Sequence, residues 1–557
     1  MGSSRILAAA ALALCGCVTE PHPFPIAKPL WVDDDRQPCV PEPEVAFSPF
    51  GWDGADNLIF RPLSESLALK TSGESINVNS MDEVPNSSWF TNRIGRTPMT
   101  PEEVARGPCT RPSPETDFPW TVIGAKVDGA NPGFLIRTAG GTRYLLKFDD
   151  AKQPERATGA DVVGSKLYHA AGYHVPCNEV VLFSREQLVA PAPGAKASGK
   201  PITEARVTEV LGLAPALPDG RYRAIASELL SGKVVGPWNY SGVRADDYND
   251  VVAHEDRREI RGSRLLAAWL NHFDARAQNT LGMWIKAKGD KGYIEHYIID
   301  WGDTLGSQWD WDAITRRLGH TYVLDFGAMG ADFVTFGAVE RPWDRAQLGP
   351  GGATLGYFTD RDFDPEAWKM EYPNAAFQAM TERDGAWAAR SIARMDDAVL
   401  AAVVDKARFS DPVVSAELLR VLIARRDKVL DRYLSRVSSL TEPRLVAPPS
   451  APRLCLTDIA PKADLARASA DAHAAGEAPK TRLPILVSGA EVCLEIPATA
   501  ARYLVVDVRE SPERPPARVH LVREQGAWLV VGLERPEGSG PPAVPSQPRT
   551  LAQTESP

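Results

Sequence analysis

A histidine, an aspartate and an asparagine stand close together in the stretch LNHFDARAQNT, residues 270–280. His272, Asp274 and Asn279 follow a run whose apolar residues recur at helical spacing, so they lie where a helix ends. A helix end needs only one capping residue, such as an Asn or a Gly. A carboxylate can accept the proton of a hydroxyl group, and carboxylate and amide oxygens can bind a divalent cation. The stretch is therefore a candidate for acid–base or metal-assisted chemistry.

The segments around this stretch divide into a strand-rich part and a helix-rich part. The run FLIRTAGGTRYLLKF (134–148) holds two β-rich segments around Gly140-Gly141, which predicts a hairpin with a two-residue turn. Residues 155–172 predict a helix that ends at Gly172 and whose apolar face consists of Ala160, Val163, Leu167 and Ala170. Further strands are expected at 175–183 and 221–230, and further helices at 255–273 and 410–434.

The order of these motifs resembles the protein-kinase-like fold. In the kinase catalytic loop an H-x-D pair is followed five residues on by Asn, which His272, Asp274 and Asn279 match. The segment YIIDWGD then ends an apolar strand in Asp-x-Gly, so Asp300 stands where the kinase D-F-G aspartate stands. Upstream, Lys147 at the end of YLLKF matches the lysine of the third kinase strand. The literal DFG at Asp325 lies too far past Asn279 to take that place.

This resemblance implies ATP and Mg²⁺ as cofactors and a role for each matched residue. Asp274 would be the catalytic base beside His272, and Asn279 and Asp300 would hold magnesium through oxygen. Lys147 would contact the α- and β-phosphates of the nucleotide.

The sequence departs from the protein-kinase pattern at two places. The usual glutamate partner of the lysine is replaced by Asp161, with Glu155 as the alternative. In place of G-x-G-x-x-G, the segment VDGANPGFLI supplies Gly129 and Gly133 as nucleotide-binding glycines, and Glu228 completes the expected nucleotide site. The loop looks more like that of HipA-type kinases, and no A-P-E segment follows Asp300. The resemblance, which covers residues 116–440, is therefore nearer to the HipA-type and lipid-kinase-like members.

The predicted fold class is α+β, with a bilobal kinase-like domain and a small C-terminal β-module. Residues 18–115 are rich in Pro, Asn, Ser and Asp and are expected to wrap the surface of the following domain. The expected segments are a signal peptide (1–17), a proline-rich N-terminal extension (18–115), a strand-rich N-lobe (116–240), a helical C-lobe (241–440), a β-module (441–535) and a disordered tail (536–557).

The N-terminus predicts export and lipid attachment. One Arg precedes the apolar run 6–14, which is too short to span a bilayer and reads as a signal peptide. The run ends in LCGC, which resembles the bacterial lipobox with Cys17 as the acylated residue and Cys15 as a second candidate. We therefore expect the chain to be anchored to the bacterial cell envelope, at the outer membrane or the periplasmic face. A net charge of −10 without a long basic run argues against nucleic acid as a partner.

Export makes disulfides possible. Cys455 and Cys493 flank a segment with little core of its own and are predicted to form one. Cys39 and Cys109 flank the proline-rich extension in a similar way, which leaves Cys177 as a small buried apolar residue.

Three functions fit these residues. The first is an ATP- and magnesium-dependent phosphotransferase of the cell envelope, acting on an unknown hydroxyl acceptor. The alternative is a catalytically inactive, kinase-fold lipoprotein that serves as a binding or scaffold protein, since the compartment to which it is exported holds little ATP. A third hypothesis is a structural lipoprotein whose β-module binds an envelope protein or polymer. Nucleotide binding in the presence of magnesium distinguishes the first from the others.

Overall fold

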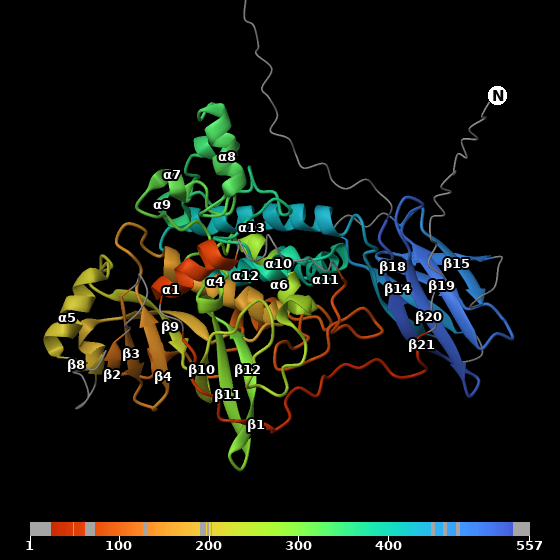
Figure 1. Ribbon diagram of the computed structural model, residues 1–557, viewed down its shortest axis with the longest axis horizontal. Coiled ribbons are helices and arrows are strands. Elements are labelled where there is room, and N and C mark those ends of the chain that lie inside the picture. The colour runs from red at the N-terminus through yellow and green to blue at the C-terminus, as the bar shows by residue number, and fades with distance from the viewer. Residues whose placement is uncertain are drawn as a thin grey trace, which may run out of the picture.

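The chain has an α+β fold with several sheets, seen in a computed structural model that describes residues 24–47, 50–61, 73–125, 132–189, 196–197, 200–201, 203–446, 452–460, 465–474 and 480–538. A strand-rich part, a helical part and a C-terminal β-module follow one another along the longest axis of the molecule (Figure 1). The described helices are α1 (Phe50–Ala55), α3 (Pro101–Arg106), α4 (Arg156–Ala171), α5 (Glu204–Leu213), α6 (Arg258–Leu270), α7 (Asp312–Thr315), α8 (Phe326–Thr335), α9 (Gly352–Leu355), α10 (Ala375–Gln378), α11 (Glu382–Ala393), α12 (Asp397–Asp405) and α13 (Pro412–Tyr433).

A six-stranded sheet forms the strand-rich part. Its order is β5-β9-β4-β3-β2-β6, with β2 (Trp120–Ala125), β3 (Gly133–Arg137), β4 (Arg143–Lys147), β5 (Asn178–Phe183), β6 (Leu188–Val189) and β9 (Tyr222–Glu228). The predicted hairpin is β3–β4, but Arg137 pairs with Arg143 and the backbone N–H of Thr138 donates to Thr142 O at 2.9 Å. The segment 138–142 joins the strands, and its residues 139–141 form the turn, so the prediction of a two-residue turn is wrong. The register that keeps Phe134 and Leu146 in the core leaves these extra residues outside the ladder.

Helices cover both faces of this sheet. Apolar residues of α5 join the core of one face, whereas Val162 of α4 packs on Val180 and Ile225 on the other. The predicted apolar positions of α4 are all fully buried, and the helix ends at Gly172, whose φ of 128° lies in the left-handed region. The helix prediction at 155–172 is thus confirmed.

A second sheet joins the strand-rich and helical parts. Its order is β1-β12-β11-β10, with β1 (Val40–Pro41), β10 (Lys233–Gly236), β11 (Thr280–Lys288) and β12 (Lys291–Ile298). The β11–β12 hairpin begins immediately after Asn279 and returns the chain to Asp300. The hairpin therefore brings two segments separated in sequence to the same place.

The helical part packs around α6, which contacts α10, α11 and α13. Helix α6 lies within the predicted helix 255–273, and its apolar residues Ile260, Leu266 and Leu270 are buried in the largest core. Helix α13 lies within the predicted helix 410–434. At its start, the Asp411 side chain accepts from the Val413 N–H at 2.8 Å, and Pro412 occupies the first turn.

The N-terminal extension does more than wrap the surface. Trp89, Phe90 and Val104 are buried in the same core as the central helices, and β1 adds an edge strand to the second sheet. The extension carries aromatic side chains of its own, whose burial removes apolar surface from water. The expectation of a surface wrap is corrected accordingly.

Two sheets packed on one core form the C-terminal β-module. One has the order β13-β14-β18-β17 and the other β16-β15-β19-β20-β21. Cys455 and Cys493 face one another across β14 and β18 and form the disulfide that the sequence predicts. The strands are β13 (Leu440–Val446), β14 (Arg453–Asp458), β15 (Ser469–Ala474), β16 (Thr481–Leu483), β17 (Ile485–Ser488), β18 (Glu491–Glu495), β19 (Tyr503–Arg509), β20 (Ala517–Glu524) and β21 (Ala527–Glu534); a separate small pair consists of β7 (Lys196–Ala197) and β8 (Lys200–Pro201).

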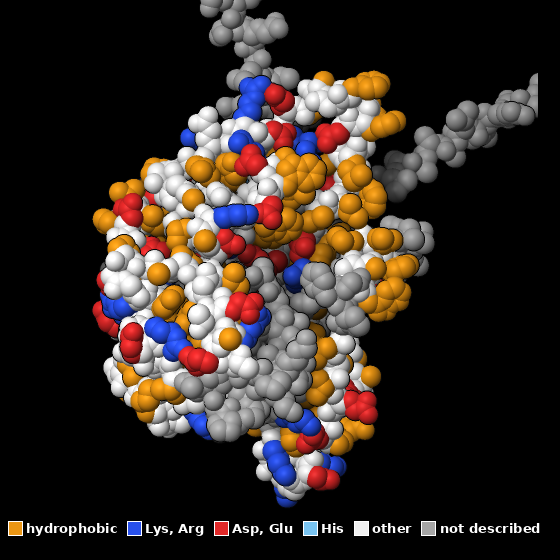
Figure 2. Space-filling model, turned by 90° about the vertical axis from the view of Figure 1, so that its left-hand side faces the viewer, with side chains coloured by type: hydrophobic (Ala, Val, Ile, Leu, Met, Phe, Trp, Pro, Cys, Tyr) orange, Lys and Arg blue, Asp and Glu red, His pale blue; other side chains and the backbone are white. Residues whose placement is uncertain are grey.

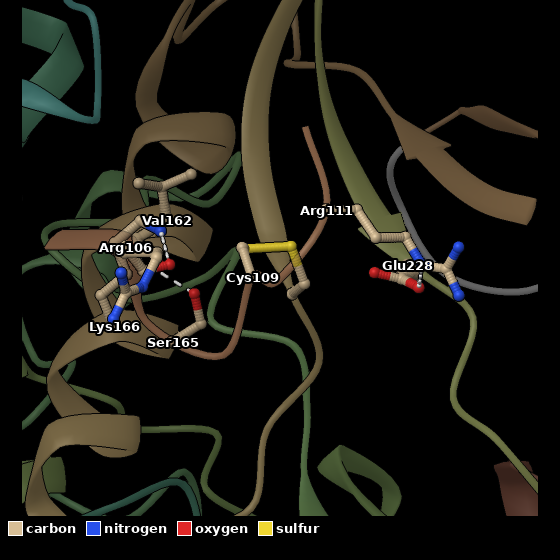
Figure 3. The surroundings of a disulfide bond; sticks show 8 residues. Arg106, Cys109, Arg111, Val162, Ser165, Lys166 and Glu228 are labelled. Carbon is tan, nitrogen blue, oxygen red and sulfur yellow. Dashed lines mark hydrogen bonds and ion pairs between the residues drawn. A yellow bond between two sulfur atoms is a disulfide. The ribbon is translucent and has the colours of Figure 1, made fainter. Parts of the chain in front are cut away.

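The second disulfide differs from the expected pairing. Cys109 is bonded to Cys177, which ties the segment after α3 to the start of β5 (Figure 3). Cys39 carries a free thiol that donates to Asn249 Oδ1 at 3.3 Å. Helix α3 packs against α4 and brings Cys109 to the sheet, a contact that spacing along the chain does not reveal.

A buried ionic cluster joins the N-terminal extension, the helical part and the β-module. Asp82 accepts from Arg258 of α6 at 2.5 Å and from Arg535, just after β21, at 2.7 Å, and Arg390 of α11 lies 3.8 Å away. Burial alone raises the pKa of Asp82, but Arg258, Arg535 and Arg390 outweigh it and hold that pKa well below its usual range. Asp82 is therefore ionised at neutral pH.

Candidate active site

Lys147 lies at the centre of the candidate site, at the end of β4. Its ammonium group contacts Asp161 Oδ2 of α4 at 2.6 Å and Asp300 Oδ1, after β12, at 2.9 Å. Burial alone lowers the pKa of Lys147, but the two carboxylates outweigh it and raise that pKa above its ordinary value. The lysine is therefore charged, and it links β4 both to the next element, α4, and to the distant segment after β12.

Asp161, rather than Glu155, is the acidic partner that α4 offers to Lys147. Its second oxygen, Oδ1, accepts from the backbone N–H of Trp301 at 2.8 Å, so the same carboxylate also fixes the residue after Asp300. Glu155 precedes the helix and accepts instead from the backbone N–H of Ser410 at 2.9 Å. The shorter aspartate thus reaches the lysine directly.

Trp301 explains how the chain approaches α4 so closely. The indole is fully buried, and a Cβ added at Gly164 would lie 2.4 Å from its ring. Asp300 itself has a φ of 59°, a left-handed conformation that is uncommon for any residue other than glycine. The packing of Trp301 on a glycine of α4 therefore holds Asp300 in this conformation beside Lys147.

The cap of α6 is a residue other than the three that the sequence singles out. Asn271 adopts the left-handed conformation (φ 51°), and its backbone N–H bonds to the last turn. His272, Asp274 and Asn279 follow it and are buried. A requirement for a helix cap therefore does not explain them.

These three residues contact one another. The Asn279 side-chain nitrogen donates to Asp274 Oδ2 at 2.8 Å and to Asp274 O at 2.9 Å, which turns its amide oxygen away from Asp274. His272 Nε2 lies 3.5 Å from Asp274 Oδ1, while His272 Nδ1 lies 3.2 Å from the hydroxyl of Tyr168. Burial lowers the pKa of His272 to about 4, so the imidazole is neutral at pH 7.

Asp274 is the most strongly perturbed carboxyl of the group. Burial raises its pKa well above the usual range, and the neighbouring Asp303 and Asp300 add to this against the opposing effect of Arg276. Its Oδ1 has no hydrogen-bond partner among the residues that the structure describes. Perturbed carboxyl groups of this kind cluster at functional sites.

Asn279 and Asp300 lie on neighbouring segments. The backbone N–H of Ile299, the residue before Asp300, donates to Asn279 O at 2.9 Å. The Asp300 and Asp303 side chains are each 41% exposed, in contrast to the buried lysine. An exposed carboxylate edge therefore borders the Lys147 contact.

Asp303 and Arg156 belong to the site and were missed in the sequence. Arg156, at the start of α4, donates to Gly302 O and to Asp303 Oδ1, the latter at 3.3 Å. Asp303 also accepts from Ser307 at 2.9 Å. In the sequence, only the second aspartate of the DWGD segment could have indicated this pair.

The expected nucleotide-binding residues separate into three groups. Gly133 opens β3 directly opposite Lys147, and Phe148 donates its N–H to Pro132 O at 3.0 Å. Gly129 lies outside the described residues. Glu228 pairs with Tyr144 at the other end of β4, and Arg111 contacts it at 3.1 Å beside the Cys109 disulfide (Figure 3). The structure thus places Glu228 away from the lysine.

Comparisons with known proteins provide no family. No family model matches the chain, and no curated protein does. Among solved structures, the chain is similar to the twitchin kinase region from C. elegans, with a TM-score of 0.21 and 12% identity over 75% of this chain and 73% of that one. A TM-score this low does not establish a shared fold, so conclusions about function depend on the site itself.

Proposed function

We propose that the chain is a kinase-like phosphotransferase of the bacterial cell envelope that uses ATP and Mg²⁺. The observation that carries the proposal is the lysine shared by Asp161 and Asp300, with Asn279 and Asp274 on the adjoining segment. Burying such charges brings little net stability, because their desolvation offsets much of their attraction. A role in binding a charged ligand explains the arrangement better than a role in stability.

The donor atoms suit magnesium. Mg²⁺ prefers oxygen ligands, and Asp300 offers a carboxylate while Asn279 offers an amide oxygen that faces away from Asp274. When bound, the ion neutralises phosphate charge. Lys147 would bind the α- and β-phosphates, Asp161 would orient Lys147, and Asp274 would hold the proton of the acceptor hydroxyl group. His272, which is neutral, would support Asp274 from the buried side.

Asn279→Ala and Asp300→Ala should each weaken magnesium-dependent ATP binding by more than about tenfold, since even residues outside the coordination sphere change metal affinity by about 10- to 100-fold. The measurement is the rise in melting temperature on adding ATP with Mg²⁺, because a ligand that binds only the folded chain stabilises it. Asn279→Asp should retain binding, since it keeps an oxygen ligand. Glu228→Gln is the matched control and should bind like the unsubstituted chain.

A specific observation favours the alternative, a binding or scaffold protein without turnover. The two disulfides suit an oxidising compartment, and an exported chain meets little ATP there. The same thermal measurement separates the two functions. An unsubstituted chain that shows no shift at millimolar ATP and Mg²⁺ would contradict the phosphotransferase.

We also propose that lipid on Cys17 anchors the chain to the envelope. No helix among the described residues is long and apolar enough to cross a bilayer. Cys17→Ser should therefore release the protein into the soluble fraction, because the acyl chains of a bacterial lipoprotein supply its firm attachment. Sedimentation of the variant with membranes, or an intact mass without lipid for the unsubstituted protein, would contradict this.

A further inference from the structure

Helix α8 exposes an unusual amount of apolar surface. None of its residues is buried, and Phe326, Phe333 and Val334 are 68%, 84% and 76% exposed. The helix projects from the helical part at the top of the molecule (Figure 1), where apolar side chains also gather in the view from the side (Figure 2). Contiguous apolar surface of this kind marks an interaction site in a folded protein.

The helix has its polar side toward the protein and its apolar side toward solvent. Asp332 is half-buried and contacts Arg341 at 2.6 Å, and the half-buried Ala328 and Thr335 lie on the same side. Viewed down the helix axis, successive residues are about 100° apart, and the exposed positions extend around the helix from Met329 to Ala331 over an arc of about 200°. None of these exposed positions is charged. Water alone would favour the opposite orientation.

The end of α8 adds a second, independent observation. Phe336 is 98% exposed and has a φ of 52°, a conformation that favours glycine or asparagine. A bulky apolar residue in this region is strained, and in water no contact compensates for that strain. Phe336 therefore extends the exposed apolar surface of α8 beyond the end of the helix.

The charges near the base of α8 are paired. Asp325 contacts Lys369 at 2.6 Å and Asp312 contacts Arg316 at 2.9 Å, and Arg345 forms an ion pair with Glu340. The occupant of this surface is therefore selected by apolar character rather than by net charge. The exposed arc of α8, about 200° wide and free of charged side chains, allows the helix to lie with its apolar face in a lipid interface.

We propose that α8 and Phe336 insert into the outer layer of a phospholipid bilayer and bind it through apolar contact. The ten residues of α8 are too few to span the hydrocarbon core, so the helix would lie in the interface. The contact is independent of the proposed phosphotransferase activity and of the nucleotide site.

The test places a dansyl-bearing amino acid at position 336 of the full chain and measures its emission with phosphatidylcholine vesicles. We expect a blue shift and quenching by lipids with brominated acyl chains, equal with or without phosphatidylglycerol and unchanged in high salt. The same probe at Val251, which is 79% exposed outside α8, should remain in water. Phe326→Ser with Phe333→Ser should weaken the response by about tenfold or more, because each removes one large apolar side chain, while melting stays unchanged.

Three results would overturn the proposal. Emission at position 336 that stays the same with all vesicles would exclude lipid as the occupant. A shift without vesicles that grows with protein concentration would show that a second copy of the chain covers α8. A shift that requires phosphatidylglycerol and disappears in salt would show that charge, rather than apolar contact, drives binding.

Discussion

Asp274→Asn should abolish phosphoryl transfer while leaving ATP and magnesium binding unchanged. The substitution keeps the shape of the side chain and an oxygen that can accept from Asn279, but it removes the carboxylate that would take the acceptor proton. Loss of a positioned general base costs about 10²- to 10⁴-fold in rate. The measurement is ADP formation from ATP and Mg²⁺, with solubilised envelope extract as the source of acceptor.

The control for this experiment is Asp312→Asn, which changes an aspartate whose side chain is 63% exposed and outside the Lys147 cluster. It should form ADP at the unsubstituted rate. If Asp274→Asn lowers only the melting temperature and leaves ADP formation intact, Asp274 is a structural residue. If the unsubstituted chain binds ATP with Mg²⁺ but forms no ADP with any acceptor, the scaffold function is favoured.

Asp82→Ala should lower the free energy of unfolding by about 3–5 kcal/mol, the cost of breaking a buried ion pair from one side. The substitution leaves the buried guanidinium groups of Arg258 and Arg535 without their shared carboxylate. Chemical denaturation at neutral pH measures the loss. Asp312→Ala breaks an exposed pair with Arg316 and should cost less than about 1 kcal/mol.

The contribution of Asp82 should also depend on pH in a defined direction. Its pKa is lowered in the folded chain, so the stabilisation is present above the unfolded pKa of about 3.9 and is lost as pH falls further. The stabilities of the unsubstituted chain and of Asp82→Ala should therefore converge in acid. A difference that stays constant from neutral pH to below about pH 3 would contradict the ionic origin of the effect.

Local patterns predicted much of the fold around the site. The β3–β4 hairpin, α4 and α6 follow from local residue patterns, and the resemblance to the kinase-like fold pointed to Lys147, Asp161 and Asp300 as a group. Each of these elements has a signal in its own residues, either an apolar repeat or a glycine turn, and this signal does not depend on distant contacts.

The features that sequence reasoning missed depend on contacts between distant segments. The Cys109–Cys177 disulfide requires α3 to pack on α4. The register of β9 on β4 places Glu228 opposite Tyr144, away from Lys147. Arg156 contacts Asp303 where the segment after β12 packs on α4, with Trp301 against Gly164. Neither hydrophobic period nor residue spacing encodes such contacts, since each depends on how whole elements dock.

The Asp82 cluster also has a consequence for the order in which the chain matures. Arg535 and Asp82 are 453 positions apart, and ribosomes make the chain from the N-terminus. Until the last strand has been made, the cluster of Asp82, Arg258 and Arg390 lacks the guanidinium group of Arg535. The buried ionic cluster is therefore complete only after nearly all of the chain has been synthesised.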